Sequence, residues 1–216
     1  METKALRAQM NPHFIFNCMS AIDGYISRNE KEKASEFLSQ FSQLIRKTLE
    51  NSRQKEIELS RELETLDLYI QMEQKRFHFA FDYDINLDKS LQTASMKIPP
   101  MLLQPFAENA ILHGLRNLRD KKGSLFINIQ QEKNDLVIIF EDNGIGREAA
   151  AAISRNKDRH QSLGNTITEE RIQLLNRFEN IQGKVMYNDL LEPDGSAAGT
   201  RVTLLLQNYF LSRLYL

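Results

Sequence analysis

Residues 100–114 read Pro-Met-Leu-Leu-Gln-Pro-Phe-Ala-Glu-Asn-Ala-Ile-Leu-His-Gly, and residues 141–146 read Glu-Asp-Asn-Gly-Ile-Gly. The first stretch is a helical pattern of apolar residues that is interrupted by Glu108, Asn109 and His113. The second places Asp142 directly after a strand-like run and follows it with two glycines. Because buried polar groups need partners, these two stretches together predict a nucleotide pocket in an α/β domain.

Composition bounds the class of protein. The chain has 216 residues, 41% hydrophobic and 26% charged, which is ordinary for one or two globular domains. A formal net charge of −1 and the absence of tryptophan argue against a nucleic-acid partner. The longest purely aliphatic and aromatic run, Leu136 to Phe140, is far shorter than the ~20 residues that cross a bilayer. A single cysteine, Cys18, excludes an intramolecular disulfide and indicates a reducing cytosol.

The first 79 residues have a helical pattern, and we expect helices at about 4–28, 31–50 and 60–79. In the last of these, apolar residues recur at positions 59, 63, 66, 70 and 77, with Glu73 as the exception. Spacings of three and four are typical of a helical bundle or coiled coil. Ser60 is the expected N-cap of this helix.

From residue 80 the period changes to two, because Phe81, Tyr83, Ile85 and Leu87 alternate with polar residues. We expect a strand there, a helix at about 101–115 after Pro99-Pro100, a polar flexible stretch at 144–165 and a helix around 167–178. Further strands are expected at 125–131, 136–141, 184–190 and 200–207. The pattern predicts an α+β chain: a helical module (1–79), an α/β sandwich (80–208) and a tail of unknown role (209–216).

Asp142 stands at the expected strand end, where its carboxylate can accept a hydrogen bond from an exocyclic amine such as that of adenine. Gly144 and Gly146 lack a β-carbon, so a flat ring can approach the backbone there. The same residues are also typical of a simple tight turn after a strand.

Asn109 and His113 are four residues apart, so they share one helix face. An amide oxygen such as that of Asn109 suits Mg²⁺, which also binds phosphate oxygens. Glu108 is a candidate base or a partner of these groups, and His113 could meet phosphates. A helix end with polar caps and Gly114 as the stop is the alternative.

Ser162-Leu163-Gly164 and Gly199-Thr200 can bring backbone N–H groups close to phosphate. The ordered set, Glu-Asn-x-x-x-His-Gly, Asp-x-Gly-x-Gly, a glycine and then Gly-Thr, resembles the Bergerat ATP-binding fold over residues 80–207. The resemblance implies that Asn109 binds Mg²⁺ with ATP and that Asp142 binds the adenine amine. It also implies a lid over the ATP at about 147–165, ending at Gly164. Here the lid carries one glycine in His160–Gly164, where such lids often have three.

His13 lies in the segment Asn-Pro-His-Phe-Ile-Phe-Asn at 11–17, on a polar stripe with Gln9, Asn17 and Ser20. An imidazole is mostly neutral at cytosolic pH and can accept a phosphoryl group. A solvated or interface histidine is the alternative. Pro12 either bends the helix or starts a new one.

The order of Pro-His-Phe-x-Phe-Asn before the ATP-binding pattern resembles the LytS/YehU type of sensor histidine kinase. The resemblance implies autophosphorylation of His13 with ATP and Mg²⁺ and transfer to an aspartate on the receiver domain of a response regulator. It also implies a homodimer and a cytoplasmic portion of a membrane sensor, anchored only by an upstream segment. Two alternatives stay open: a nucleotide-binding dimeric scaffold that transfers nothing, and a Bergerat-type ATPase without phosphohistidine.

Overall fold

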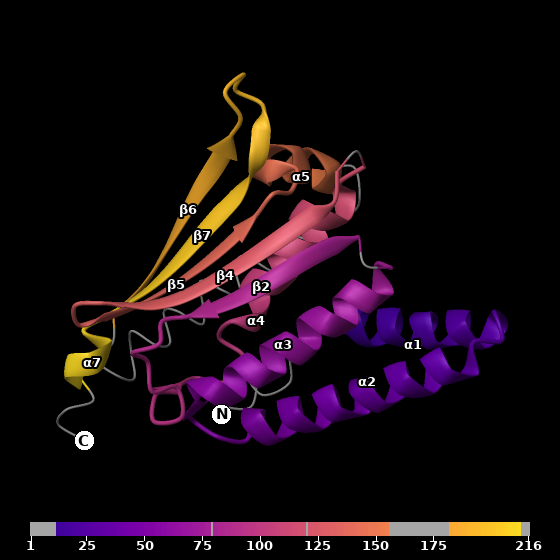
Figure 1. Cartoon of the computed structure of the whole chain (residues 1–216), viewed down its shortest axis with the longest axis horizontal. Coiled ribbons are helices and arrows are strands. Elements are labelled where there is room, and N and C mark those ends of the chain that lie inside the picture. The colour runs from indigo at the N-terminus through magenta and orange to yellow at the C-terminus, as the bar shows by residue number, and fades with distance from the viewer. Residues whose placement is uncertain (1–11, 79, 120, 156–181, 213–216) are drawn as a thin grey trace. The chain divides into compact units, whose positions relative to one another are not determined.

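The computed structural model describes residues 12–78, 80–119, 121–155 and 182–212 (Figure 1). The chain divides into two compact units. One comprises Met1–His78 with Ala94–Met101, and the other comprises Phe79–Thr93 with Leu102–Leu216. The predicted α+β architecture is confirmed, because the first unit is helical and the second is built on a mixed sheet.

The helical unit contains α1 (Pro12–Ser27), α2 (Lys31–Ser52) and α3 (Leu59–Arg76). Phe14 is buried in its core, with ring centroids 6.4 Å from Phe41 and 5.2 Å from Tyr69. Asn29 turns the chain between α1 and α2 in a left-handed conformation with φ 58°, which asparagine tolerates better than most residues. These contacts bury one stripe of each helix, as the apolar spacing predicts.

The spacing predicted for α3 is confirmed at four of its five positions, since Leu59, Leu63, Leu66 and Ile70 are all buried. The fifth, Phe77, follows the last residue of the helix and is half-buried. Glu73 is also buried, at 1% exposure, where it is paired with Arg76. An opposite charge one turn away compensates a carboxylate that would otherwise be costly to bury.

The prediction that Ser60 caps α3 is wrong. The helix begins at Leu59 and Glu58 occupies the N-cap position. The Leu59 N–H donates instead to the carbonyl of Met96 at 2.7 Å, because two short strands, β1 (Ile57–Glu58) and β3 (Lys97–Ile98), pair just before the helix. The C-terminal end also comes earlier than expected, at Arg76 rather than 79.

The second unit contains a five-stranded sheet in the order β2-β4-β5-β7-β6 (Figure 1). The strands are β2 (Phe81–Leu87), β4 (Gly123–Glu132), β5 (Asp135–Asp142), β6 (Gln182–Leu191) and β7 (Ala197–Gln207). β2 runs parallel to β4 and the other neighbours are antiparallel. All five predicted strands are therefore confirmed, and β5 lies in the middle of the sheet.

One face of the sheet buries alternating residues against a helix. The helical segment consists of α4 (Gln104–Asn109), a π turn η3 (Ala110–Gly114) and a 3-10 turn η4 (Leu115–Asn117). Phe106 of α4 stacks on Phe140 of β5, with ring centroids 5.3 Å apart. The helix predicted at 101–115 thus begins later, with Pro105 in its first turn, a position that suits proline.

Two segments were not foreseen as helices. Residues 144–155 were predicted to be flexible, but Gly146–Arg155 forms α5, and its four consecutive alanines at 149–152 are strong helix formers. The helix expected at 167–178 lies outside the described residues. In the tail, Tyr209–Ser212 forms α7, and Tyr209 is buried at 1% exposure. The described part of the tail therefore packs on this unit.

Candidate functional site

Asp142 is the last residue of the central strand β5, with β4 on one side and β7 on the other. Its side chain is only 5% exposed. The Gly144 N–H donates to its Oδ1 at 2.8 Å, and the backbone of Thr200 also hydrogen-bonds the carboxylate. The carboxyl group is therefore held in one orientation by the backbone around it.

Burial is the largest influence on the pKa of Asp142. Burial raises the pKa of this carboxyl to about 6, while the backbone bonds from Gly144 and Thr200 oppose that rise. A buried carboxylate is stabilised by any hydrogen-bond donor that it gains. The site thus favours a ligand with an amine or amide N–H, which fits the exocyclic amine of adenine.

Three glycines pack directly against Asp142. A Cβ on Gly114 would lie 2.7 Å from the Asp142 Oδ1, and a Cβ on Gly144 would lie 2.5 Å from the Gly114 backbone. Gly199 has φ +137°, and a Cβ there would lie 1.8 Å from the Asp142 carbonyl oxygen. Any side chain at these positions would displace the carboxyl or the backbone around it. The described residues therefore form a cradle that excludes side chains around a buried acceptor.

A helix stop at Gly114 was the alternative reading of this segment, and its contact with Asp142 gives it a further role. It lies at the end of the π turn η3, and its carbonyl accepts the Ile145 N–H at 3.4 Å. The only sequence signal for this contact is the position of Gly114 directly after His113, in the motif that carries the resemblance.

Asn143 is a second residue whose role was not foreseen. Its Oδ1 accepts the Ser124 N–H at 2.7 Å, and its Nδ2 donates to the Lys122 carbonyl at 3.2 Å. These bonds fix the turn after Asp142 to the start of β4. Asn143 thus acts as a brace for the backbone that carries the candidate adenine acceptor.

Gly146 and α5 are fixed to strands β6 and β7. Gly146 has φ +77° and a Cβ on it would lie 3.0 Å from the Ala197 Cβ. The next residue, Arg147, makes a forked ion pair with Asp189 of β6, at 2.7 and 2.8 Å, and lies over the Tyr187 ring at 5.5 Å. These contacts position the start of α5 next to the glycines.

Glu108 and Asn109 end α4, and His113 lies in η3, which contacts β5, β7 and α5. All three side chains are half-buried. Burial and then the charge of Arg116 hold the pKa of His113 below its ordinary value, which favours the neutral imidazole. π turns are rare in helices, and those that occur are often found at functional sites.

Of the remaining predicted site residues, the structure describes Thr200 and the backbone of His13. Thr200 is buried at 8% exposure and pairs with Asp142 in the sheet register. Ser162, Leu163 and Gly164 lie outside the described residues. His13 follows Pro12 in α1 of the helical unit, and its side chain is also outside the described set.

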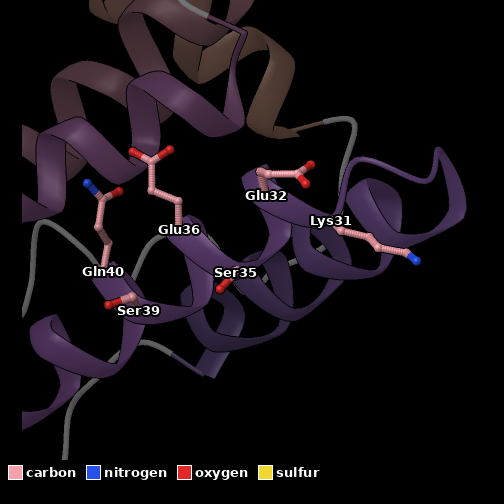
Figure 2. A pocket seen from close by; sticks show the side chains of 6 residues that line it. All are labelled: Lys31, Glu32, Ser35, Glu36, Ser39 and Gln40. Carbon is pink, nitrogen blue, oxygen red and sulfur yellow. The ribbon is translucent and has the colours of Figure 1, made fainter.

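A hollow on the helical unit has none of this chemistry. It is lined by Lys31, Glu32, Ser35, Glu36, Ser39 and Gln40 of α2 (Figure 2). These side chains come from one helix and are all polar, as on a solvated helix face. Across the described ranges, no group of three or more His, Cys, Asp or Glu side chains is placed to hold a metal ion. Over the same ranges, each helix is too short or too polar to span a membrane.

Residues 1–81 match the family model described as Histidine kinase. The Sensor protein LytS of Oceanobacillus iheyensis is 39% identical over 158 residues, which cover 73% of this chain and 26% of that protein. The Sensor protein LytS of Staphylococcus epidermidis is 31% identical over 209 residues, which cover 95% of this chain and 33% of that protein. The chain thus spans between a quarter and a third of the length of these relatives.

A solved structure shows the fold. The histidine kinase domain from the Erythrobacter litoralis EL346 blue-light activated histidine kinase superposes with a TM-score of 0.52 at 14% identity. The match covers 99% of this chain and 95% of that chain. At this identity the likeness concerns the architecture alone.

Proposed function

Because this chain belongs to the LytS type of the histidine kinase family, we propose that it is a kinase core that transfers the γ-phosphoryl group of ATP to His13. The phosphoryl group then passes to an aspartate of a response-regulator receiver domain. The observation that carries the proposal is the cradle of Gly114, Gly144 and Gly199 around buried Asp142, in a chain whose residues 1–81 match this family.

The cradle supports ATP as the ligand. A buried acceptor such as Asp142 selects a ring that bears an N–H donor, and the glycines leave room for a flat ring at the backbone. The neutral imidazole of His113 can donate a hydrogen bond to a phosphate oxygen without requiring a proton from solvent. Asn109, one residue before the π turn, offers an amide oxygen for Mg²⁺, which would neutralise phosphate charge.

We propose that His13 is the phosphoryl acceptor. The imidazole nitrogen attacks the γ-phosphorus, the bond from that phosphorus to the bridging oxygen breaks, and ADP leaves with the negative charge. Such a reaction depends mainly on positioning and on charge neutralisation. Glu108, which is half-buried at the end of α4, is the candidate base for the imidazole proton.

We further propose that the chain forms a homodimer through the helical unit. On α1, Phe16, Met19 and Ile26 share one face and are 68%, 57% and 61% exposed. On α2, a hollow is lined by Leu38, Phe41, Ile45 and Leu49, together with Ser42, Arg46, Glu50 and Arg53. Apolar stripes at helical spacing that stay open in a single chain are typical of a helix–helix interface. An upstream membrane segment remains part of the proposal for the whole sensor.

The test is incubation of the purified chain with γ-labelled ATP and Mg²⁺, followed by treatment of the labelled protein with acid and with alkali. We expect label that is lost in acid, survives alkali and is absent from His13→Gln, whose nucleotide affinity should match the wild type. Nucleotide binding without label would instead support the scaffold alternative. Phosphate release without label would support a simple ATPase.

A further inference from the structure

The second unit, Phe79–Thr93 with Leu102–Leu216, is called the ATP-binding unit after its proposed function. Residues 94–101, which we call the strap, leave this unit and return to the helical unit before the chain re-enters the ATP-binding unit at Leu102. The strap lies along the start of α3. Its Met96 carbonyl accepts the Leu59 N–H at 2.7 Å, and Lys97–Ile98 pairs with Ile57–Glu58 as an antiparallel ribbon. The two units are therefore joined by the chain at both ends of the strap.

The strap ends on a buried hydrogen bond. The Met101 N–H donates to Oε2 of Glu62 in the first turns of α3, at 2.9 Å. Glu62 is 2% exposed and Met101 is 8% exposed. The two preceding residues, Pro99 and Pro100, have no N–H group, so the Met101 N–H is the first donor after the ribbon. Glu62 captures that donor.

Met101 itself is held in an unusual conformation. Its φ is +59°, a left-handed value that a long side chain rarely adopts without an external constraint. Gln104, the first residue of α4, follows three residues later, and α4 ends at Asn109. The bond from Glu62 therefore sets the backbone conformation just ahead of the helix that carries the proposed Mg²⁺ ligand.

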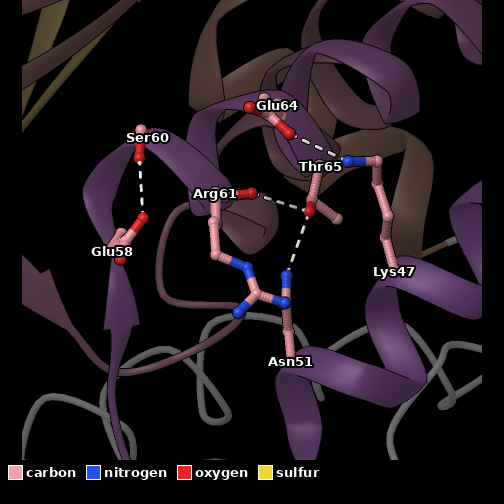
Figure 3. A network of polar contacts seen from close by, with 7 residues as sticks. All are labelled: Lys47, Asn51, Glu58, Ser60, Arg61, Glu64 and Thr65. Carbon is pink, nitrogen blue, oxygen red and sulfur yellow. Dashed lines mark hydrogen bonds and ion pairs between the residues drawn. The ribbon is translucent and has the colours of Figure 1, made fainter. Parts of the chain in front are cut away.

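The part of α3 that bears Glu62 is itself rigidly attached. The Asn51 Nδ2 of α2 donates to the Thr65 Oγ1 at 3.1 Å, and this hydroxyl donates to the Arg61 carbonyl at 2.9 Å (Figure 3). Asn51 and Thr65 are 2% and 4% exposed. Buried polar contacts thus hold the start of α3 from two sides, one toward α2 and one toward the strap.

We propose that Glu62 is a positioning residue for phosphoryl transfer, acting through Met101 and the strap on the start of α4. The proposal rests on the proposed function. The residues of the adenine cradle all lie in the ATP-binding unit, so loss of the Glu62 bond leaves nucleotide affinity in place. Transfer to His13 requires the two units to meet in a defined geometry, and a small misplacement can slow such a step by about a hundredfold.

The test compares three variants of the full chain. Glu62→Met removes the acceptor at similar size, Glu62→Gln keeps an acceptor oxygen, and Glu64→Met makes the same change at an exposed position of α3. For Glu62→Met we expect the kcat of His13 labelling to fall at least about tenfold, with KM for ATP changed less than about twofold. Glu62→Gln should restore most of the rate, and Glu64→Met should behave as wild type.

Equal labelling rates in Glu62→Met and wild type would overturn the proposal, as would a loss of rate that Glu62→Gln does not restore. If Glu62→Met does not fold, Glu62→Asp takes its place, because it withdraws the carboxylate by one methylene.

A second readout does not depend on the kinase activity. Hydrogen exchange of a peptide spanning residues 94–103 should slow when a non-hydrolysable ATP analogue binds to wild type and Glu62→Gln, but not to Glu62→Met. A wild-type chain that binds nucleotide without labelling His13 would refute the proposed function. The exchange experiment would then still decide whether Glu62 connects the strap to the nucleotide site. If exchange in the wild-type strap does not slow when the nucleotide binds, the proposed role of Glu62 is overturned.

Discussion

The Gly114 Cα faces the carboxylate of Asp142 so closely that a Cβ would lie 2.7 Å from the Asp142 Oδ1. These residues are 28 positions apart in the sequence and come from a π turn and from the end of the central strand. Their contact defines how deep the candidate adenine acceptor lies, because neither backbone can move without displacing the other.

Gly114→Ala should therefore impair nucleotide binding. The added methyl group must displace the carboxylate or the π turn, and overpacking of this kind typically costs about 1–3 kcal/mol. We expect ATP affinity to fall about tenfold or more, measured by titration calorimetry. Gly24→Ala is the matched control, since its Cβ would meet only the Arg28 guanidinium at 3.4 Å. Unchanged affinity in Gly114→Ala would contradict the cradle.

Asp142→Asn should stabilise the ligand-free chain while it weakens nucleotide binding. Burial raises the pKa of Asp142 from 3.8 to about 6, so the folded state loses stability as the pH rises from about 4 through 6. Above pH 6 the loss is about 3 kcal/mol, because each pKa unit corresponds to about 1.4 kcal/mol. An amide oxygen can still accept the Gly144 N–H without this loss.

The measurement is urea unfolding of both proteins at pH 7.5 and at pH 4. The free energy of unfolding should be higher for Asp142→Asn at pH 7.5, and the difference should vanish at pH 4, where the wild-type carboxyl is protonated. A difference that persists at pH 4 would show that packing, not ionisation, is responsible.

Much of the sheet-containing unit could be predicted from the sequence, because its strands have a local period. Residues 81–86 alternate in burial as their pattern predicts, although Leu87 at the end of the strand is exposed, and Asp142 ends β5 as expected. The glycines at 144, 146 and 199 were predicted as close approaches to a ligand, and the structure adds a steric reason at each one. Local periodicity and local turn chemistry carried these predictions.

Features that depend on distant residues could not be predicted. A two-residue strand at Lys97–Ile98 has no period, so its return to Ile57–Glu58 left no pattern to read. The residue type of Ser60 favours it as the cap of α3, whereas the helix begins one residue earlier, where the Met96 carbonyl of the strap accepts the Leu59 N–H. The π turn and the Gly114 contact with Asp142 likewise arise from packing between segments far apart in the chain.

Nucleotide binding should depend on the protonation of Asp142. An amine that donates to the carboxylate binds best when that group is ionised, so affinity should be constant above about pH 6.5 and should fall below about pH 6. Well below the pKa the loss approaches tenfold per pH unit. Adenosine is the suitable ligand, because it has no phosphate that titrates in this range.

The matched control for this profile is Asp142→Asn, whose adenosine affinity should be weak and should not vary between pH 5 and 7.5. A wild-type profile that is flat over the same range would argue that the acceptor of the amine is a different group.

Leu49→Asp should weaken the proposed dimer. Leu49 is 50% exposed and lines the apolar hollow on α2, and burying a leucine is worth about 1.5–3 kcal/mol. We expect the dimer dissociation constant, measured by sedimentation equilibrium, to rise at least about tenfold, while the helical content by circular dichroism is retained. Leu191→Asp is the control, because it introduces the same charge at a leucine of β6 that is 64% exposed. Equal weakening by both substitutions would indicate a general effect of charge, and a wild-type chain that stays monomeric would refute the helical interface.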